Sequence, residues 1–213
     1  IVTDSLFSMD GDKCLLKSLV SLKKKYDCEI MVDEAHATGI FGKNGSGVVE
    51  EEGFSAQVDF IMGTFSKALG SFGAYLAASK KTVEYLINIC RGFIYSTALP
   101  PAVIAANLES IKIVEEEPQR RKKLLESSCY FRAELKKIGL EVKGDSQIIP
   151  VIIGDNLKCV ESARRLREKG YWVLAIRPPT VPQGGARLRF SLNLYHTREI
   201  LQRLIDDIRG IKI

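Results

Sequence analysis

The sequence predicts an α/β protein that has a parallel sheet in its first half and a smaller α+β domain in its second. Three observations favour this class. Short apolar strands alternate with a helical segment in the first hundred residues, which is typical of α/β folds. Two long helical segments begin after about Pro100. Beyond Gly139 shorter strands and helices follow. We therefore expect the remainder of a larger α/β domain over residues 1–100, and linking helices plus a small α+β domain over residues 101–213.

The first half contains four expected strands and one expected helix. Ile1–Phe7 is short and β-prone, and it is predicted as the first strand. Four apolar residues recur with helical spacing and predict an amphipathic helix: Leu15, Leu19, Leu22 and Tyr26. Three continuous apolar runs without alternation predict parallel strands buried on both faces: Glu29–Asp33, Val58–Gly63 and Ala74–Ala78.

The second half begins with two long helices, Ala102–Glu117 and Arg120–Ile138. They are separated at Pro118, a residue that suits the first turn of a helix. The small domain is then predicted to contain the strands Ile148–Ile153, Tyr171–Ala175 and Ala186–Leu192, and the helices Leu157–Lys169 and Thr197–Ile208. The last helix carries one apolar face, formed by Ile200, Leu201, Leu204, Ile205 and Ile208.

The composition excludes several classes of protein. Hydrophobic residues make up 46% and charged residues 27%, which is typical of globular proteins. The net charge of 31 − 26 = +5 is spread over amphipathic segments, so we expect no nucleic-acid partner. The five cysteines form no C-x-x-C pair, which argues against a disulfide framework and a zinc site and favours the reducing cytoplasm. No apolar run approaches the roughly 20 residues that span a bilayer, so no membrane association is expected.

Reactive side chains follow the predicted strands, at the edge where α/β sheets bind ligands. They are Ser8, Asp33, His36, Thr64 and Lys67. A carboxylate at a strand end can keep a pyridine nitrogen protonated, and a lysine can form an imine. A threonine hydroxyl and backbone N–H groups can bind a phosphate, while a histidine and a serine can hydrogen-bond to a phenolic oxygen. Together these groups predict a site for pyridoxal 5'-phosphate (PLP).

Two motifs carry a family resemblance. The segments Asp33–Gly39 (DEAHATG) and Gly63–Gly70 (GTFSKALG) resemble the α-oxoamine synthases, which are PLP enzymes of the aspartate-aminotransferase fold, also called fold type I. The resemblance extends over essentially the whole chain. It implies three catalytic residues. Lys67 carries the cofactor as a Schiff base, Asp33 pairs with its pyridine nitrogen, and His36 approaches its phenolic oxygen.

The same resemblance assigns further cofactor contacts. Ser8 is expected near the phenolic oxygen, and Thr64 at the phosphate. The segment Tyr95–Pro101 resembles the one that reaches the phosphate of the neighbouring subunit, so Ser96 and Thr97 are expected there in a homodimer with shared active sites. The family also uses a glycine-rich turn and a ring-stacking histidine from an N-terminal half. Neither is present, so we expect that an N-terminal portion is missing and that this piece is unstable by itself.

The C-terminal motif indicates the substrates. Ala175–Pro182 (AIRPPTVP), followed by Gly185–Arg189 (GARLR), most resembles the family members that join L-alanine to a pimeloyl thioester and form 8-amino-7-oxononanoate for biotin. By this resemblance Arg189 binds the substrate carboxylate, Thr180 contacts the substrate, and Arg177 offers a second carboxylate contact. Arginine suits this role because its planar fork matches a carboxylate. Arg187 is expected on the same strand face as Arg189, and we expect that only one of these two arginines reaches the site.

Several alternatives remain open at this point. A sister synthase that uses glycine or serine fits the same motifs: 2-amino-3-ketobutyrate CoA ligase, 5-aminolevulinate synthase or serine palmitoyltransferase. The acyl group could ride on CoA or on acyl carrier protein, and a non-catalytic protein of the same fold is also conceivable. Asp33–His36 (DEAH) also spells a motif of nucleic-acid motors. A motor requires a G-x-x-x-x-G-K-[ST] loop, however, and Gly39–Asn44 has the wrong spacing for it.

Overall fold

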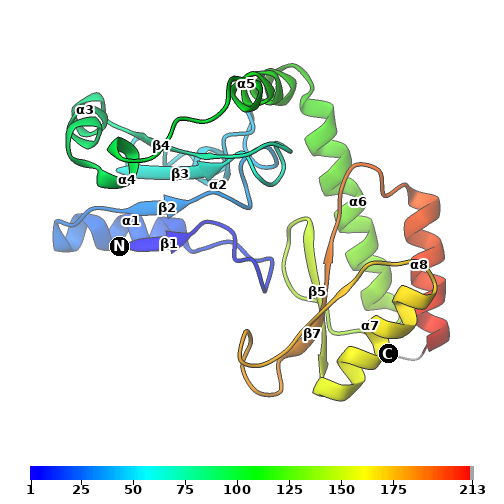
Figure 1. The fold of residues 1–213 in the computed structure, drawn as a ribbon. Helices are drawn as coiled ribbons and strands as arrows, with labels where there is room; N and C mark the ends of the chain where they lie inside the picture. The colour runs from blue at the N-terminus through cyan, green and yellow to red at the C-terminus, as the bar shows by residue number, and fades with distance from the viewer. Residues whose placement is uncertain (212–213) are drawn as a thin grey trace. The chain divides into compact units, whose positions relative to one another are not determined.

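The chain folds into two compact units. The computed structural model describes residues 1–211. Residues 1–6 and 13–121 form the N-terminal unit, and residues 7–12 together with those from 122 onward form the C-terminal unit (Figure 1). The division falls at residue 121 and not at the predicted residue 100, because α5 (Pro101–Glu116) belongs with the first unit. The Asn107 amide in α5 donates to the carbonyl of Phe72 over 3.1 Å.

The N-terminal unit contains a four-stranded sheet in the order β1-β2-β3-β4. Its strands are β1 (Val2–Asp4), β2 (Met31–Asp33), β3 (Phe60–Thr64) and β4 (Ala74–Ala78). The strands β1, β2 and β3 are parallel, which confirms the predicted direction for β2 and β3. β4 runs antiparallel to β3, so the expectation that it is also parallel is wrong. The physical reason is the length of the connection. Only residues 65–73 join β3 to β4, and a parallel crossover needs about a dozen residues or more.

Two helices pack against this sheet, α1 (Leu16–Tyr26) and the short α2 (Val48–Glu51). The apolar stripe predicted for α1 is wrong, since Leu15 and Tyr26 are 76% and 64% exposed. The buried face is instead formed by Leu16 and Val20, which join the core of Cys14, Ile30, Val32, Val49 and Val58. Lys23 continues that face and pairs with Asp59 at 2.5 Å. Because the charged Lys23 lies on the buried face, the predicted stripe contains more apolar residues than the face that is actually buried.

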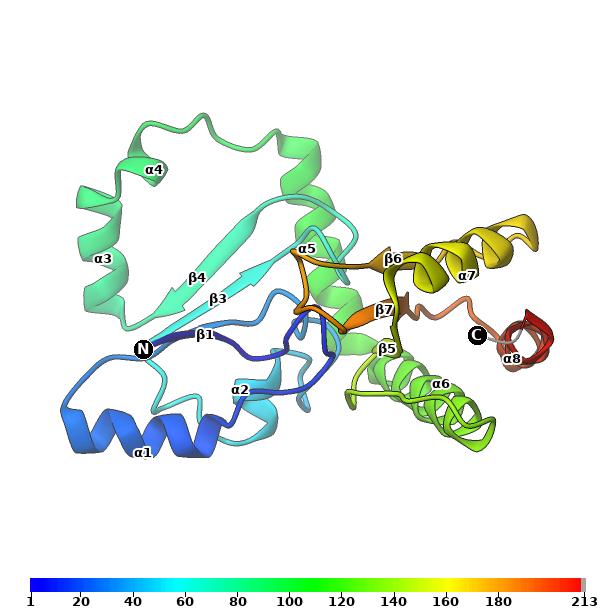
Figure 2. The same cartoon turned by 90° about the horizontal axis from the view of Figure 1, so that it is seen from below.

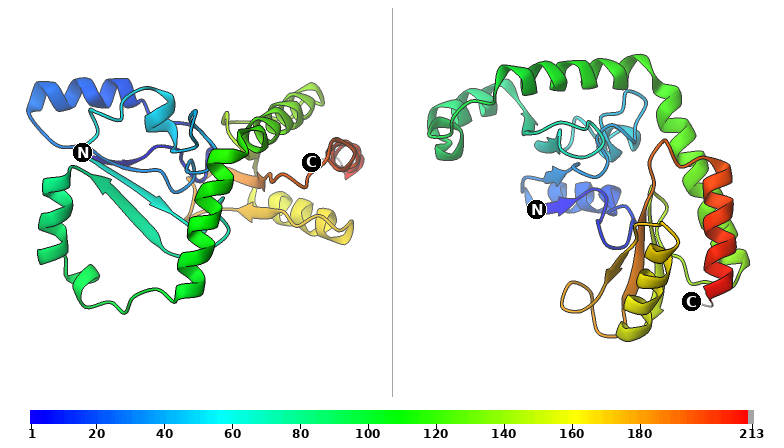
Figure 3. Two further views of the ribbon diagram at one scale, coloured as in Figure 1. Left: turned by 90° about the horizontal axis from the view of Figure 1, so that it is seen from above. Right: turned by 45° about the vertical axis from the view of Figure 1, so that its right-hand side comes forward.

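The opposite part of the N-terminal unit exposes much apolar surface. The helices α3 (Lys80–Ile89) and α4 (Arg91–Ile94), which the sequence analysis did not predict, contain no buried residue. Ser79 caps α3 by accepting a hydrogen bond from the backbone N–H of Thr82 at 3.2 Å. Large exposed side chains in β4, α3, α4, α5 and their connections include Phe72, Leu76, Tyr85, Ile87, Phe93, Tyr95 and Leu108. Figure 3 shows the helices α3, α4 and α5 spread along the β4 edge of the unit's sheet.

The C-terminal unit is a three-stranded antiparallel sheet covered by helices. Its order is β5-β7-β6, with β5 (Ile148–Gly154), β6 (Leu174–Ile176) and β7 (Ala186–Ser191). Figure 2 shows α6 (Pro118–Lys137), α7 (Asn156–Glu168) and α8 (Arg198–Ile211) on one side of it. All six elements lie close to their predicted positions. The predicted face of α8 is also confirmed, because Leu201, Leu204, Ile205 and Ile208 are buried in the core.

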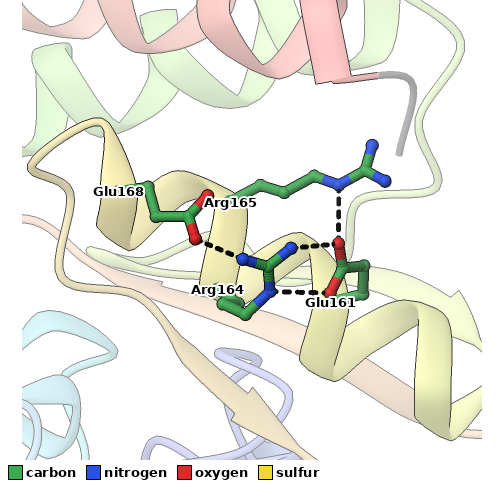
Figure 4. A network of polar contacts seen from close by, with 4 residues as sticks. All are labelled: Glu161, Arg164, Arg165 and Glu168. Carbon is green, nitrogen blue, oxygen red and sulfur yellow. Dashed lines mark hydrogen bonds and ion pairs between the residues drawn. The ribbon is translucent and has the colours of Figure 1, made fainter.

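The outer face of α7 carries a network of ion pairs (Figure 4). Glu161 accepts from Arg164 at 2.6 Å and from Arg165 at 2.9 Å, and Arg164 also pairs with Glu168. Hydrogen bonds from Arg164 and Arg165 lower the pKa of Glu161 to about 2. The network is solvated and sensitive to salt, so it supports the helix without indicating a site. Among residues 1–211, no helix is long and apolar enough to cross a membrane, and no group of side chains could hold a metal ion.

Candidate active site

The carboxyl ends of β1 and β2 bring two carboxylates together in the N-terminal unit. Asp4 and Asp33 are direct partners in the parallel register of these strands, so their side chains lie on the same face of the sheet. Oδ1 of Asp33 accepts a hydrogen bond from the backbone N–H of Ala35 at 2.7 Å, which orients the carboxylate at the point where β2 ends. His36 is half-buried in the turn that follows. Asp33 and His36 therefore occupy the sheet edge that the sequence predicts for them.

Lys67 lies exposed in the loop between β3 and β4. Thr64 organises this loop, since its hydroxyl donates to the carbonyl of Gly73 at 2.9 Å and accepts from the backbone N–H of Ser66 at 3.2 Å. A further hydrogen bond of 2.7 Å joins the hydroxyls of Thr64 and Ser66. Ser66 is exposed and was missed as a candidate, although its place between Thr64 and Lys67 was visible in the sequence. Two hydroxyls, rather than one, thus lie next to Lys67, and both are engaged within the loop in this structure.

Asp4 is a second residue that the sequence analysis missed. Burial raises the pKa of Asp4, the charge of Asp33 raises it further, and the charge of Lys67 lowers it. Asp33 and Lys67 therefore lie close enough to Asp4 for their charges to act on its carboxyl group. The signal was available, because Asp4 ends the first strand just as Asp33 ends the second.

Glu34, the second residue of the DEAH motif, has a structural role that requires no nucleotide. Its side chain is fully buried and accepts from the Ser5 hydroxyl at 2.5 Å and from the backbone N–H groups of Val48 and Val49 at 3.1 and 2.6 Å. Burial raises the pKa of Glu34, while these three hydrogen bonds lower it. A carboxylate that activates water at a nucleotide must be reachable by water. Glu34 instead holds the start of α2, which disfavours the motor alternative.

The two arginines of β7 lie on one face of the C-terminal sheet, as predicted. Ala186, Leu188 and Phe190 belong to the core beneath the helices, so Arg187 and Arg189 point to the opposite face. The half-buried Arg189 donates from Nε to the carbonyl of Ser8 at 2.6 Å and from Nη1 to the hydroxyl of Ser191 at 2.9 Å. Burial lowers the pKa of Arg189, and no carboxylate among the described residues counteracts that shift. Its guanidinium is therefore oriented and remains available to an anionic ligand.

Arg187, in contrast, is committed to an internal ion pair. It is 4% exposed, and its Nη1 donates to Oδ1 of Asp10 at 2.6 Å. Its Nε donates to the carbonyl of Gly185 at 2.9 Å. These contacts favour Arg189 as the arginine of the pair that binds substrate.

The remaining predicted residues lie on exposed segments. Arg177 and Thr180 share a turn directly after β6, which a hydrogen bond of 3.1 Å from the Thr180 N–H to the Arg177 carbonyl closes. The Pro178–Pro179 peptide bond in this turn is cis. Ser96 and Thr97 follow α4 and are exposed, and the Ser96 hydroxyl donates to the carbonyl of Gly92 at 2.5 Å.

The predicted site residues thus divide between the units. The N-terminal unit carries Asp33, His36, Thr64, Lys67, Ser96 and Thr97, and the C-terminal unit carries Ser8, Arg177, Thr180 and Arg189. In the N-terminal unit a carboxylate, an amine and two hydroxyls gather at one sheet edge. These groups fit the ring nitrogen, the aldehyde carbon and the phosphate of PLP. The roles of the individual residues remain predictions.

Comparison with known proteins identifies the family. The model of the family "Aminotransferase class I and II" matches residues 1–208. The chain belongs to this family. A Geobacillus kaustophilus protein, provisionally named 8-amino-7-oxononanoate synthase, is 49% identical over 210 residues, which cover 98% of this chain and 54% of that protein. A Bacillus cereus protein with the same provisional name is 45% identical and is 53% covered. The chain therefore spans about half the length of the curated relatives it matches.

Solved structures show the same fold. Serine palmitoyltransferase from Sphingomonas wittichii superposes with a TM-score of 0.94 at 34% identity, covering 98% of this chain and 53% of that one. 8-Amino-7-oxononanoate synthase from Francisella tularensis superposes with a TM-score of 0.88 at 29% identity, covering 100% and 62%. Another serine palmitoyltransferase structure, 32% identical, is described as containing PLP. These findings confirm the predicted fold and confirm that the family is PLP-dependent.

Proposed function

We propose that the protein, at its full length, is a PLP-dependent acyltransferase of biotin biosynthesis. It would condense L-alanine with a pimeloyl thioester, release carbon dioxide and the thiol, and form 8-amino-7-oxononanoate. The observation that carries the proposal is the placement of Asp33 and Lys67 at the carboxyl ends of neighbouring strands β2 and β3. The choice of L-alanine and the pimeloyl group is supported by the names of the curated relatives, which reach 49% identity.

The residues of this chain have distinct tasks in this reaction. PLP, when bound, supplies the electron sink that accepts the electron pair left at the substrate Cα. Asp33 holds a proton at the pyridine nitrogen, which its orientation by Ala35 supports. Lys67 would hold the cofactor through its Nζ, and the same nitrogen, when free, would take up the proton from the substrate Cα. Arg189 binds the carboxylate of the amino acid through its planar fork.

Other residues position the cofactor and the substrate. The hydroxyls of Thr64 and Ser66 bind the phosphate, and His36 and Ser8 hydrogen-bond to the phenolic oxygen. Arg177 and Thr180 contact the substrate from the turn after β6.

A homodimer would complete the phosphate site through Ser96 and Thr97 of the partner subunit. Their exposure beside the exposed side chains of Phe93 and Tyr95 supports an interface at this segment. A cytoplasmic location is supported by the five cysteines, all of which are free.

Covalent labelling tests the central assignment. Borohydride reduction of the full-length protein loaded with PLP should fix the cofactor to the peptide that contains Lys67. The variant Lys67→Ala should take up no label, whereas the control Lys80→Ala, at an exposed position of α3, should label normally. Label on any other lysine of the unaltered protein would overturn the assignment.

A sister reaction with serine is the second candidate, because the serine palmitoyltransferase structures superpose with TM-scores of up to 0.94. Turnover of alanine, glycine and serine should be compared with pimeloyl and palmitoyl thioesters, each on CoA and on acyl carrier protein. Highest turnover with alanine and a pimeloyl donor supports the first proposal. Turnover with serine and palmitoyl-CoA alone would replace it.

A further inference from the structure

The loop of residues 7–12 belongs to a different unit from the residues on either side of it. Residues 7–12 connect two segments of the N-terminal unit but belong to the C-terminal unit by their contacts. The stem of the loop is closed in the N-terminal unit by the bridge between Leu6 and Lys13. Inside the loop, the Phe7 N–H donates to the Asp12 carbonyl at 2.9 Å and the Gly11 N–H to the Phe7 carbonyl at 2.8 Å. This loop, which carries Ser8, therefore has a defined shape of its own.

Side chains of β7 hold the first part of this loop. Arg189 donates to the Ser8 carbonyl at 2.6 Å. Arg187 donates from Nη1 to the carbonyl of Met9 at 3.3 Å and to the carboxylate of Asp10 at 2.6 Å. Three consecutive residues of the loop are thus bound by the two arginines of one strand.

The segment before β5 holds the second part. The hydroxyl of the fully buried Ser146 donates to the Gly11 carbonyl at 2.8 Å, and the Asp145 N–H donates to the same carbonyl at 3.1 Å. Gly11 has a φ of +66°, and a Cβ there would lie 2.3 Å from the carbonyl oxygen of Ile148. The loop backbone therefore lies directly against β5, at a distance that only glycine permits.

The ion pair at the centre of these contacts is strongly asymmetric. The side chain of Arg187 is 5% exposed, and that of Asp10 is 43% exposed. A buried guanidinium needs a carboxylate partner, because carbonyl oxygens alone do not neutralise its charge. Asp10 supplies that partner from the loop, so the burial of Arg187 depends on the loop being in place.

We propose that Arg187 is a positioning residue whose ion pair with Asp10 fixes residues 7–12 on β5 and β7. Ser8 and Arg189 then form one rigid element within the C-terminal unit. This inference rests on the proposed function, in which Ser8 contacts the cofactor and Arg189 binds the substrate carboxylate. Since Arg189 also holds the carbonyl of Ser8, binding an amino acid at Arg189 is coupled to the hydrogen bond from Ser8 to the cofactor.

The test uses the full-length protein loaded with PLP. Two quantities are measured: the pH midpoint of the visible absorbance change of bound PLP, and the Kd for L-alanine from spectral titration. Asp10→Asn should shift the midpoint in the same direction as Ser8→Ala and should raise the Kd by about tenfold. Arg187→Lys, which keeps the charge but not the planar fork, should show smaller changes of the same sign. The matched control is Asp207→Asn, which breaks the 2.6 Å pair with Lys169 in the same unit and should change neither quantity.

A double variant separates positioning from general damage. If Asp10 acts through Ser8, the combination of Ser8→Ala and Asp10→Asn should shift the midpoint no further than Ser8→Ala alone. Additive shifts would overturn the proposal, as would an unchanged midpoint and Kd in Asp10→Asn. Amide hydrogen exchange without PLP gives an independent reading. Asp10→Asn should raise exchange in residues 7–12 but not in β7.

The outcomes also separate this inference from the proposed function. If the unaltered protein binds no PLP, or shows no spectral response to alanine, glycine or serine, the proposed function fails. Exchange in residues 7–12 then decides whether the ion pair holds the loop. If the unaltered protein binds PLP and responds to an amino acid, and Asp10→Asn has the same pH midpoint and the same Kd as the unaltered protein, only the proposed role of Arg187 is lost.

Discussion

Arg189 donates from Nε to the carbonyl oxygen of Ser8 at 2.6 Å, which joins two residues 181 positions apart in the sequence. One comes from the start of the chain and the other from the last strand of the C-terminal sheet. The hydrogen bond fixes one edge of the guanidinium, and the Ser191 hydroxyl fixes Nη1. The arginine is therefore held before any ligand arrives, which reduces the entropy lost when a carboxylate binds.

Replacing this arginine should weaken amino-acid binding. In the full-length protein with PLP, we expect Arg189→Lys to raise the Kd for L-alanine by at least about tenfold, since an ammonium cannot donate along one planar edge to both Ser8 and a carboxylate. Spectral titration measures this change. Arg198→Lys, at the start of α8, is the control and should bind as the unaltered protein does. An unchanged Kd in Arg189→Lys would remove Arg189 from the substrate site.

Removing Glu34 should destabilise the N-terminal unit. Glu34→Ala leaves the Ser5 hydroxyl and the N–H groups of Val48 and Val49 without their buried acceptor, so we expect a loss of about 3 kcal/mol in the free energy of unfolding. Ser5→Ala deletes one of the three hydrogen bonds and should cost about 1 kcal/mol. Urea unfolding of the full-length protein measures both. The control is Glu84→Ala on the exposed helix α3. If Glu34→Ala and Glu84→Ala unfold at the same urea concentration, the structural role of Glu34 is contradicted.

The sequence was most informative where chemistry depends on position along a strand. Asp33 and Lys67 could be found because residues that follow parallel strands gather at one sheet edge. The direction of β4 was also within reach, since the length of residues 65–73 excludes a parallel crossover, but its apolar composition suggested a parallel strand. The apolar composition of a strand indicates that it is buried, but it does not indicate whether the strand runs parallel or antiparallel to its neighbour.

Other features depend on contacts that the local sequence does not contain. The core face of α1 was misassigned because Lys23 lies on it, and its partner Asp59 is 36 residues away. The pairing of Arg187 with Asp10 spans 177 residues, and neither residue has a local pattern that points to the other. Sequence periodicity places Arg187 and Arg189 on one face, yet only the contacts show that Arg187 is occupied.

The cysteines should differ sharply in reactivity. Burial raises the pKa of Cys14 and that of Cys159 to about 11, so at pH 8 only about one thiol in a thousand of each is ionised. Cys129 is exposed on α6. We expect iodoacetamide at pH 8 to modify Cys129 in the native protein, and Cys14 and Cys159 only after denaturation. Peptide mass spectrometry over time measures the order, and early modification of Cys159 would contradict its burial.

Asp4 should make stability depend on pH in a defined direction. Burial and the charge of Asp33 raise the pKa of Asp4 above its ordinary value of 3.8. The folded state therefore binds the proton more tightly than the unfolded state, and the contribution of Asp4 to stability falls as pH rises above about 4. Asp4→Asn removes the ionised form and should unfold at a higher temperature than the unaltered protein at pH 7.

The same variant should lose its advantage in acid. Below about pH 4 the carboxyl of Asp4 is protonated in both the folded and the unfolded state, so the two proteins should differ little in Tm. Thermal unfolding of the full-length protein between pH 3.5 and 7 measures the difference. Glu109→Gln, on an exposed face of α5, removes one negative charge as a control and should show no such dependence. If Asp4→Asn has a lower Tm at pH 7, Asp4 instead stabilises the folded protein through its attraction to Lys67, and the repulsion from Asp33 is the weaker effect.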